Sequence, residues 1–304
     1  MGENDTVSIY RDDGIVLRTQ KLGEADRIVT VLARKTGRIR AVAKGVRRTK
    51  SRFGARLEPF THVDLLLYTG RSLDVITQAE TLRSYGEALA GDYPRYTTGT
   101  AMLEAAERFT VVEKEPALRQ FLLLVGGLRT LVDGGHDPRL VLDAYLLRSL
   151  AVAGYAPALD ECAICGTRAP ATDHRMMHPA MAEPAARRAA TEATGDTGGT
   201  GGTGGTGGTG GTGGTGRSGR TGRTGRRTFG VAAGGLVCRS CWAPGAATAA
   251  APTVDLMSAL LRGDWGLADA SERRYRVECS GLVAAYVQWH LEHSIRSLRH
   301  VEHA

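Results

Sequence analysis

Four cysteines occupy positions from which their sulfurs could hold one metal ion. They form two Cys-x-x-Cys pairs, Cys162 with Cys165 and Cys238 with Cys241. The two-residue spacer lets both sulfurs of a pair reach the same ion from a tight turn, and two such pairs supply the four ligands of a structural Zn²⁺ site. Four protein ligands leave no coordination position for water or substrate. The pattern therefore predicts a zinc ion that stabilises the fold and does not catalyse a reaction.

Disulfides and a redox dithiol are the alternative roles for these cysteines. Residues 1–14 carry four acids and no apolar core, so no secretory signal is apparent, and no stretch reaches the roughly 18 to 20 apolar residues of a membrane span. We therefore expect a soluble cytoplasmic protein, in which structural disulfides are disfavoured. A thioredoxin-type dithiol needs one Cys-x-x-Cys inside a βαβ pattern, which the sequence lacks. Cys279 lies in an apolar segment, and we expect it to be a buried small side chain.

A low-complexity tract separates the two cysteine pairs. Residues 198–216 repeat Gly-Gly-Thr, a composition that cannot bury enough apolar area to offset the chain entropy lost on ordering. We predict a disordered insertion from about residue 171 to 227, and the arginines at its C-terminal end could form a loose arm for nucleic acid. Doubling the length of a loop costs only about 0.6 kcal/mol. The insertion is therefore compatible with a zinc ribbon that spans residues 161–245.

Basic residues cluster near the N-terminus of a chain whose net charge is +7. Positions 34 to 56 contain ten lysines and arginines and no acid, which favours binding to a polyanion. The segment 45–54 also contains a phenylalanine, whose ring could stack on a base while guanidinium groups contact phosphates. A solvated basic loop and a buried phenylalanine are the alternatives. The residues predicted to contact DNA are Arg34, Lys35, Arg38, Arg40, Lys44, Arg47, Arg48, Lys50, Arg52 and Phe53.

The residues around this segment are predicted to form short strands. Apolar runs rich in β-branched and aromatic residues fall at 7–10, 14–17, 28–32, 39–43, 63–68 and 73–76. Turn signals separate them at Asp12-Asp13-Gly14, Thr36-Gly37 and Thr69-Gly70. Many short strands without a helical period suggest an OB-fold barrel over residues 1–82. Alternation along 38–44 places Ile39, Ala41 and Ala43 inside this barrel and Arg38, Arg40 and Lys44 on its opposite face.

After residue 85 the apolar period changes to that of helices. The pattern predicts helices over 100–112, 116–132 and 138–152, and a closing helix over 281–301. Pro116 and Pro138 stand at plausible first-turn positions, and Gly134-Gly135 breaks the pattern between two helices. The expected fold class is α+β: a barrel (1–82), a helical domain (83–160), the zinc ribbon (161–245) and a closing helical part (246–304).

Several segments resemble RecO, the bacterial family of DNA repair and recombination mediator proteins. They are Gly14-Ile-Val-Leu, Gly23-Glu-Ala-Asp-Arg-Ile, Ala43-Lys-Gly-Val-Arg-Arg-x-Lys-Ser-Arg-Phe, Leu57-Glu-Pro-Phe-Thr-His and the paired Cys-x-x-Cys. The resemblance spans the chain except for the insertion, and it implies an N-terminal OB fold joined to a helical domain with a zinc knuckle. It carries a DNA-binding role to the basic residues at 44, 47, 48, 50 and 52, which match the motif of the family.

The resemblance also implies what such a protein does. RecO proteins bind single- and double-stranded DNA and anneal complementary strands. In the RecF pathway they work with RecR to load the recombinase RecA onto strands coated by the single-strand binding protein SSB, whose C-terminal tail binds in the helical domain. We therefore expect a nucleoid-associated cytoplasmic protein without catalytic residues, because annealing requires neutralised DNA backbones and no bond-making chemistry.

Two other classes of protein remain as alternatives. A nucleobase deaminase is suggested by His290-Leu-Glu292, which spells a His-x-Glu element. In deaminases this element precedes a Pro-Cys-x-x-Cys, whereas here it follows both cysteine pairs, and no proline precedes either of them. The second alternative is a non-catalytic zinc-ribbon adaptor that binds only protein and does not anneal DNA.

Overall fold

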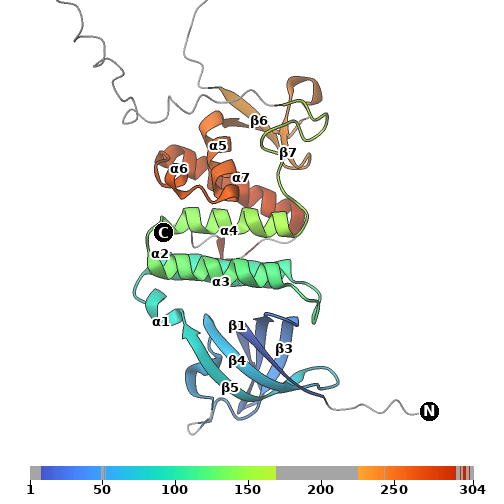
Figure 1. Ribbon diagram of the computed structural model, residues 1–304, viewed down its shortest axis with the longest axis vertical. Coiled ribbons are helices and arrows are strands. Elements are labelled where there is room, and N and C mark those ends of the chain that lie inside the picture. Colours follow the sequence, from blue (N-terminus) through green and yellow to red (C-terminus); the bar gives the residue numbers. More distant parts are fainter. Residues whose placement is uncertain are drawn as a thin grey trace, which may run out of the picture. The chain divides into compact units, whose positions relative to one another are not determined.

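The computed structural model describes residues 8–48, 51, 53–168, 225–242, 244–291, 295, 297, 298 and 301. Almost all of the predicted insertion, including the Gly-Gly-Thr repeat, lies outside these residues, as do Lys50 and Arg52. The described part contains a closed five-stranded barrel, a group of helices and a small three-stranded sheet (Figure 1). No helix in the described ranges is long and apolar enough to cross a membrane.

The N-terminal barrel has the strand order β1-β2-β3-β5-β4. Neighbouring strands pair antiparallel except for β3 and β5, which pair in parallel with Ala41 opposite Asp74 and Val42 opposite Val75. This parallel contact belongs to the five-stranded OB fold, so the predicted fold class is confirmed. The strands are β1 (Ile9–Leu22), β2 (Asp26–Ala33), β3 (Gly37–Ala43), β4 (Thr61–Tyr68) and β5 (Asp74–Ser84).

Strand β3 alternates as its sequence predicts. Ile39, Ala41 and Ala43 are buried in the barrel core, while Arg38 and Arg40 are partly exposed on the other face. The same core contains Val16, Val29, Val63 and other apolar side chains from all five strands. Because side chains alternate along a strand, burial of one face directs every second residue of β3 outward.

The predicted turn at Asp12-Asp13-Gly14 is wrong, because these residues lie within the long strand β1. The Asp12 carboxylate accepts hydrogen bonds from the backbone N–H groups of Lys35 and Thr36, the latter at 2.8 Å. Asp13 pairs with His62 at 2.8 Å and with Arg34 at 3.0 Å. A Cβ atom on Gly14 would lie 2.5 Å from Val31 Cγ1, so glycine permits close packing of the strands here. Polar residues that are typical of turns thus find their hydrogen-bond and ion-pair partners while they lie in a strand.

The helical part follows the predicted order with shifted ends. Helix α2 begins seven residues before the predicted start, because the Asp92 side chain accepts a hydrogen bond from the N–H of Arg95 and so caps the helix. Helix α3 begins two residues after Pro116, whereas Pro138 does start α4 and Gly134 does end α3. The helices of this part are α1 (Gly86–Leu89), α2 (Tyr93–Phe109), α3 (Leu118–Asp133) and α4 (Pro138–Val152).

Of the closing helices, α5 and α7 pack on α4, and α6 packs on α5. Helix α7 begins eight residues before the predicted start, because Tyr275 and Cys279 extend the buried stripe of Leu282 and Val283 towards the N-terminus. Cys279 is fully buried, as expected. Residues 292–294 lie outside the described ranges, so the predicted end of this helix is not tested. The closing helices are α5 (Ala251–Arg262), α6 (Trp265–Asp269) and α7 (Arg273–Leu291).

The loop between α2 and α3 fastens the helices to the rim of the barrel. The N–H of Lys114 donates to the carbonyl of Arg38 at 2.9 Å, and the Lys114 ammonium contacts the buried Asp74 carboxylate at 2.8 Å. Arg38 donates to the carbonyl of Val111. The carbonyl of Glu115 lies so close to Gly37 that a Cβ atom there would be 1.8 Å away. This junction is completed by Ile15, Leu17, Leu32 and Phe60, which belong to the same hydrophobic core as the helices.

The ribbon sheet has the strand order β7-β6-β8. Its strands are β6 (Arg226–Gly230), β7 (Gly235–Val237) and β8 (Ala247–Ala250). Arg226 and Arg227 pair with Ala250 and Ala249, so these two arginines belong to a strand and not to a loose arm. The ribbon also extends past residue 245, because β8 supplies the backbone partners of β6.

The two glycines of the barrel turns provide a matched test of the junction. Gly23 has φ +59° and open space around it, whereas Gly37 has φ +82° and meets the carbonyl of Glu115. We expect Gly23→Ala to lower the free energy of unfolding by about 1 to 2 kcal/mol, the cost of left-handed backbone. Gly37→Ala should cost at least about 3 kcal/mol, because a steric clash is added. Urea unfolding of both variants measures the difference between their free energies of unfolding. Equal losses in the two variants would mean that the loop moves away from Gly37 at no cost.

A buried acid on α4 should make stability depend on pH. The Asp143 carboxyl is buried and accepts a hydrogen bond from Ser280 on α7 at 2.6 Å, and burial raises its pKa to about 7. The folded state therefore holds this proton at pH values where the unfolded chain has released it. The protonated Asp143 therefore stabilises the fold at low pH. As pH rises from about 4 to 7 the free energy of unfolding falls by about 4 kcal/mol in total.

Asp143→Asn removes the titrating group and keeps an acceptor for Ser280. Its free energy of unfolding relative to the parent chain should rise between pH 4 and pH 8, as measured by urea titrations at several pH values. The exposed Asp133 serves as the control, since Asp133→Asn should show no such trend. A difference between Asp143→Asn and the parent that stays constant with pH would contradict a raised pKa.

Candidate metal centre and nucleic-acid interface

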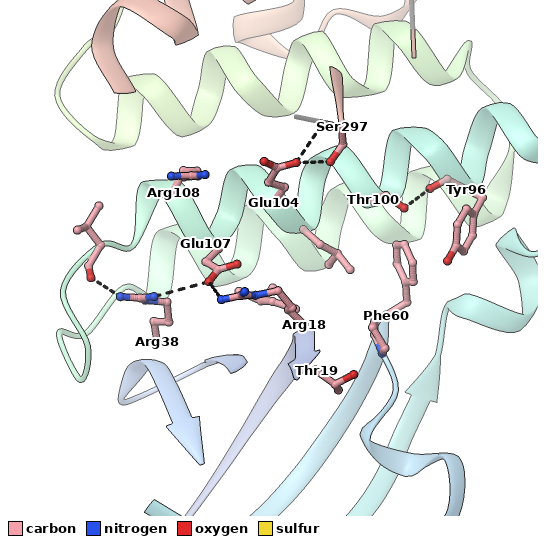
Figure 2. A pocket seen from close by; sticks show the side chains of 14 residues that line it. Arg18, Thr19, Arg38, Phe60, Tyr96, Thr100, Glu104, Glu107, Arg108 and Ser297 are labelled. Atoms are coloured by element: carbon pink, nitrogen blue, oxygen red, sulfur yellow. Dashed lines mark hydrogen bonds and ion pairs between the residues drawn. The ribbon is translucent and has the colours of Figure 1, made fainter. Parts of the chain in front are cut away.

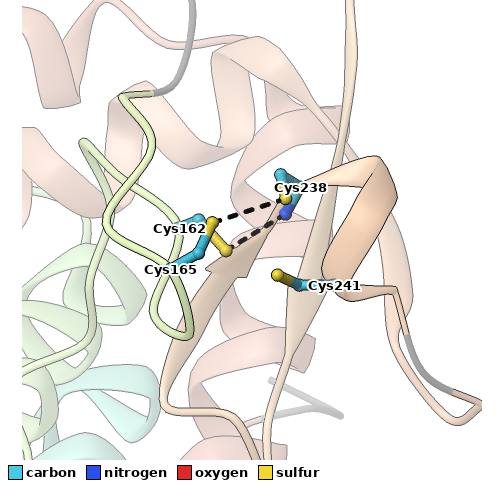
Figure 3. Close-up of side chains that lie close together, drawn as sticks. All are labelled: Cys162, Cys165, Cys238 and Cys241. Carbon is cyan, nitrogen blue, oxygen red and sulfur yellow. Dashed lines mark hydrogen bonds between the residues drawn. The ribbon is translucent and has the colours of Figure 1, made fainter.

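The structure brings the four cysteines of the predicted metal site together (Figure 3). Their sulfur atoms all lie within 4.8 Å of one another, and Cys165 Sγ is 3.7 Å from Cys238 Sγ. A tetrahedral ion with metal–sulfur bonds of about 2.3 Å would separate its sulfurs by about 3.8 Å. The geometry and the all-thiol donor set therefore fit a structural metal ion held by Cys162, Cys165, Cys238 and Cys241.

Backbone pairing brings the two cysteine pairs to this position. The N–H of Leu236 in β7 donates to the carbonyl of Ala158 at 2.8 Å, and the N–H of Ala163 donates to the carbonyl of Leu236 at 2.7 Å. Gly235 has φ +153°, and a Cβ atom on it would lie 2.3 Å from the carbonyl oxygen of Ala158. The segment that carries the first pair thus lies against the strand that precedes the second pair.

Hydrogen bonds favour the thiolate form of the first cysteine pair. Backbone N–H groups, chiefly that of Cys165 and then those of Cys238 and Ile164, lower the pKa of Cys162 to about 6. The Thr167 hydroxyl, 3.2 Å from Cys165 Sγ, lowers the pKa of Cys165. Thiolates are the metal-binding form of cysteine, so this pair is prepared to hold an ion.

His290 does not join the cysteine cluster. Among the described residues, the group that could hold a metal at this place consists of the four cysteines. The His290 ring instead packs between two tyrosines, stacked on Tyr155 at 4.5 Å and edge-on to Tyr286 at 4.5 Å. Burial lowers its pKa. Glu292 lies outside the described ranges. This aromatic packing gives His290 a structural role and weakens the interpretation of a deaminase.

The basic loop after β3 is exposed on the barrel. Lys44, Arg47 and Arg48 are all exposed, and Arg47 donates to the carbonyl of Glu24 at 2.8 Å. Lys44 and Arg48 have no ion-pair partner within the described part of the chain. Asp26 holds the loop, because its carboxylate accepts from the N–H of Gly45 at 2.7 Å. Sequence reasoning missed this positioning residue, although an Asp that follows a turn is a common backbone acceptor.

The other predicted cations lie nearer the helices. Arg34 is exposed, pairs with Asp13 and lies 5.1 Å over the Phe121 ring of α3, and Lys35 is exposed beside it. Arg40 is 3.5 Å from Glu113. Arg38 has only 14% of its side chain exposed and contacts Glu107 at 3.9 Å. Arg38 therefore belongs to the junction between barrel and helices, and not to the exposed basic surface that alternation predicts.

Phe53 is not available for base stacking in this structure. Its side chain is 1% exposed and packs in the barrel core beside Leu57, at the start of a 3-10 turn over Gly54–Leu57. The prediction of a stacking ring is therefore wrong. Burying an apolar ring in the core stabilises the folded protein more than leaving it in contact with water.

Comparison with known proteins assigns both parts of the chain to one family. The model of the family "Recombination protein O N terminal" matches residues 7–85, and that of "Recombination protein O C terminal" matches residues 90–194 and 216–299. The first match covers the barrel and the second covers the helical part, including all four cysteines of the metal site.

Relatives that carry the name "DNA repair protein RecO" match nearly the whole chain. The protein from Thermobifida fusca is 56% identical over 298 residues, which cover 98% of this chain and 100% of the relative. The protein from Streptomyces griseus subsp. griseus is 50% identical and that from Frankia casuarinae is 48% identical, each covering 97% of this chain and at least 99% of the relative. Since two models of this family match most of the chain and relatives are up to 56% identical over nearly its whole length, the chain belongs to the RecO family of DNA repair proteins.

Proposed function

We propose that this protein is a recombination mediator that binds single- and double-stranded DNA and anneals complementary strands. The observation that carries the proposal is the exposed basic loop of the barrel, where Lys44 and Arg48 have no described anionic partner and Arg47 stands between them. Such cations neutralise phosphates without reading base sequence. The relatives are DNA repair proteins by name, which agrees with DNA as the ligand.

Annealing follows from charge neutralisation and needs no catalytic residue. Two complementary strands repel each other through their phosphates, and a surface that neutralises both backbones lets their bases meet. The barrel supplies the cations on a rigid scaffold, since the loop begins directly at the end of β3 and is tied to Asp26. We therefore propose a protein that is not an enzyme and that acts where DNA is repaired, associated with the nucleoid in the cytoplasm.

The proposed partners are RecR, RecA and the C-terminal tail of SSB. In this role the protein works with RecR to load RecA onto single-stranded DNA coated by SSB, as the RecF pathway requires. A hollow of about 260 Å³ between α4 and α7 supports an SSB-tail site in the helical part, because apolar walls from Leu142, Leu146 and Ala284 stand beside Arg139. An apolar hollow with a cation suits a peptide that ends in an apolar residue and a carboxylate.

We propose Zn²⁺ as the ion of the cysteine cluster, in a structural role. An all-cysteine donor set at tetrahedral spacing selects zinc over the hard cations Mg²⁺ and Ca²⁺, which prefer oxygen ligands. Zinc would supply a cross-link between the segment after α4 and the strand β7. The chain's own backbone pairing already places these segments side by side, so the ion would strengthen an existing contact.

The first test measures DNA affinity against salt concentration. A labelled single strand should bind with a logarithmic slope of about −0.7 per neutralised phosphate, and the complement should then anneal faster than without protein. The double substitution Lys44→Ala and Arg48→Ala should weaken binding to all sequences alike and reduce the slope by about 1.4. Fluorescence anisotropy gives both quantities.

The control removes the same charge elsewhere. Arg119→Ala with Arg129→Ala takes two exposed cations from α3 and should leave DNA affinity nearly unchanged. If both double variants weaken binding equally, net charge and not the basic loop accounts for affinity. If the parent chain binds no DNA, the protein-only adaptor becomes the better proposal.

The second test removes the metal. Elemental analysis should find one zinc per chain, and treatment with a chelator should lower the melting temperature, because structural zinc sites contribute on the order of 10 kcal/mol to folding. Cys238→Ser should reproduce the loss, whereas Ser240→Ala, at the exposed residue between Cys238 and Cys241, should not. DNA binding by the barrel should persist without zinc. A chain purified without zinc that melts at the same temperature with or without added zinc would contradict the structural role.

A further inference from the structure

A hollow of about 730 Å³ lies between the barrel and helix α2 (Figure 2). Its floor comes from β1 at Leu17, Arg18 and Thr19, and its wall from the face of α2 that runs from Tyr96 to Arg108. This junction hollow is distinct from the basic loop and from the hollow between α4 and α7. It is large enough for a nucleotide, since ligand pockets of this kind measure about 300 to 1,000 Å³.

Among the described residues that line the junction hollow, three are arginines and two are glutamates. Arg18 and Arg38 share one carboxylate, that of Glu107, at 2.7 Å and 3.9 Å. The second acid, Glu104, already accepts a hydrogen bond from the N–H of Ser297 at 2.9 Å and another from its hydroxyl. Two guanidinium groups therefore share the single carboxylate of Glu107, and the described lining keeps a net positive charge.

Arg108 adds a third cation without a described partner. It is half-buried on α2, lines the hollow, and forms no ion pair or hydrogen bond with any residue that the structure describes. The Nε atom of Arg38 is also buried without a hydrogen-bond partner in the described part of the chain. Partly desolvated guanidinium groups favour an anion with several oxygen acceptors, and phosphate is such an anion.

An aromatic ring stands at the edge of the same hollow. Tyr96 is 44% exposed, and its ring packs against the buried Phe60 at 5.4 Å between centroids, which fixes its orientation. Cations beside a fixed and exposed ring are the combination that binds phosphate and base of a single strand.

Strand β1 connects the junction hollow to the basic loop. From Thr19 in the hollow, β1 continues through the exposed Lys21 to the turn at Gly23 and Glu24, whose carbonyls accept hydrogen bonds from Arg47. Four residues of strand span roughly 13 Å. A single strand of a few nucleotides could therefore extend from the loop to the hollow along one edge of β1.

We propose that the junction hollow binds consecutive nucleotides of the same single strand that the basic loop holds, with phosphates at Arg18 and Arg108 and a base against Tyr96. The inference rests on the proposed function and adds a second contact to it. A duplex is too wide and too stiff to enter the hollow, so this contact discriminates single strands from duplex DNA. The helical part would thereby take part in strand recognition.

The test compares a long single strand with duplex DNA. An oligonucleotide of about 16 nucleotides, the upper end of the range that one OB fold covers, can reach both the basic loop and the hollow. Arg108→Ala should weaken binding of the long strand about 10-fold and reduce its salt slope by about 0.7, as expected for one lost charge-assisted phosphate contact. Binding of duplex DNA should change less than 2-fold, because a duplex does not enter the hollow.

Matched variants separate this contact from general effects. Arg108→Lys keeps the charge and should restore most of the affinity, and Tyr96→Phe keeps the ring and should bind like the parent, whereas Tyr96→Ala should lose about 5-fold. Arg129→Ala on α3 removes one exposed charge outside the hollow and should have no effect. Unchanged melting temperatures would show that each variant folds.

The outcomes distinguish the inference from the proposed function. If Arg108→Ala and Tyr96→Ala bind the long strand like the parent while the Lys44 and Arg48 variant does not, the hollow is not on the DNA path and the basic loop still is. If Arg108→Ala weakens duplex binding as much as single-strand binding, the contact is a general charge effect and the inference fails. If the parent binds no DNA, both fail together.

Discussion

The close contact between the α2–α3 loop and the rim of the barrel is the constraint on which the rest of the structure depends. Gly37 has no side chain, and this lets the carbonyl of Glu115 approach the backbone of the barrel. With the loop in place, Lys114 reaches the buried carboxylate of Asp74, and Arg38 is covered by the helices. One glycine thus decides which cations of β3 belong to an internal junction and which stay on the surface.

The junction also divides the basic segment into two parts with different electrostatic roles. Arg38 lies 3.9 Å from Glu107 and Arg40 lies 3.5 Å from Glu113, so acids that follow the barrel in the chain offset part of their charge. The cations of the loop at 44–48 face solvent and keep their long-range field, because none of them forms an ion pair with a residue that the structure describes. A run of like charges along the sequence is therefore not one surface in the folded chain.

The sequence predicts regular features well and context-dependent ones poorly. The two-residue period of β3 and the spacing of the four cysteines indicate burial and proximity directly, and both predictions agree with the structure. The turn expected at Asp12 to Gly14 fails because the groups that donate to these carboxylates come from the β2–β3 turn and from β4, far along the chain. Phe53 is ambiguous in sequence, since a phenylalanine between cations suits a core and a binding surface equally well.

Backbone pairing holds the ribbon on both sides of the long insertion, so the length of the insertion can change. Glu161 bridges to Arg168 at one end of the long insertion, and β6 pairs with β8 directly after the other end. Both ends are held by backbone pairing that involves no residue of the Gly-Gly-Thr tract. Residues could therefore be gained or lost there during evolution with little effect on folding, and a reporter domain could be spliced in at the same place.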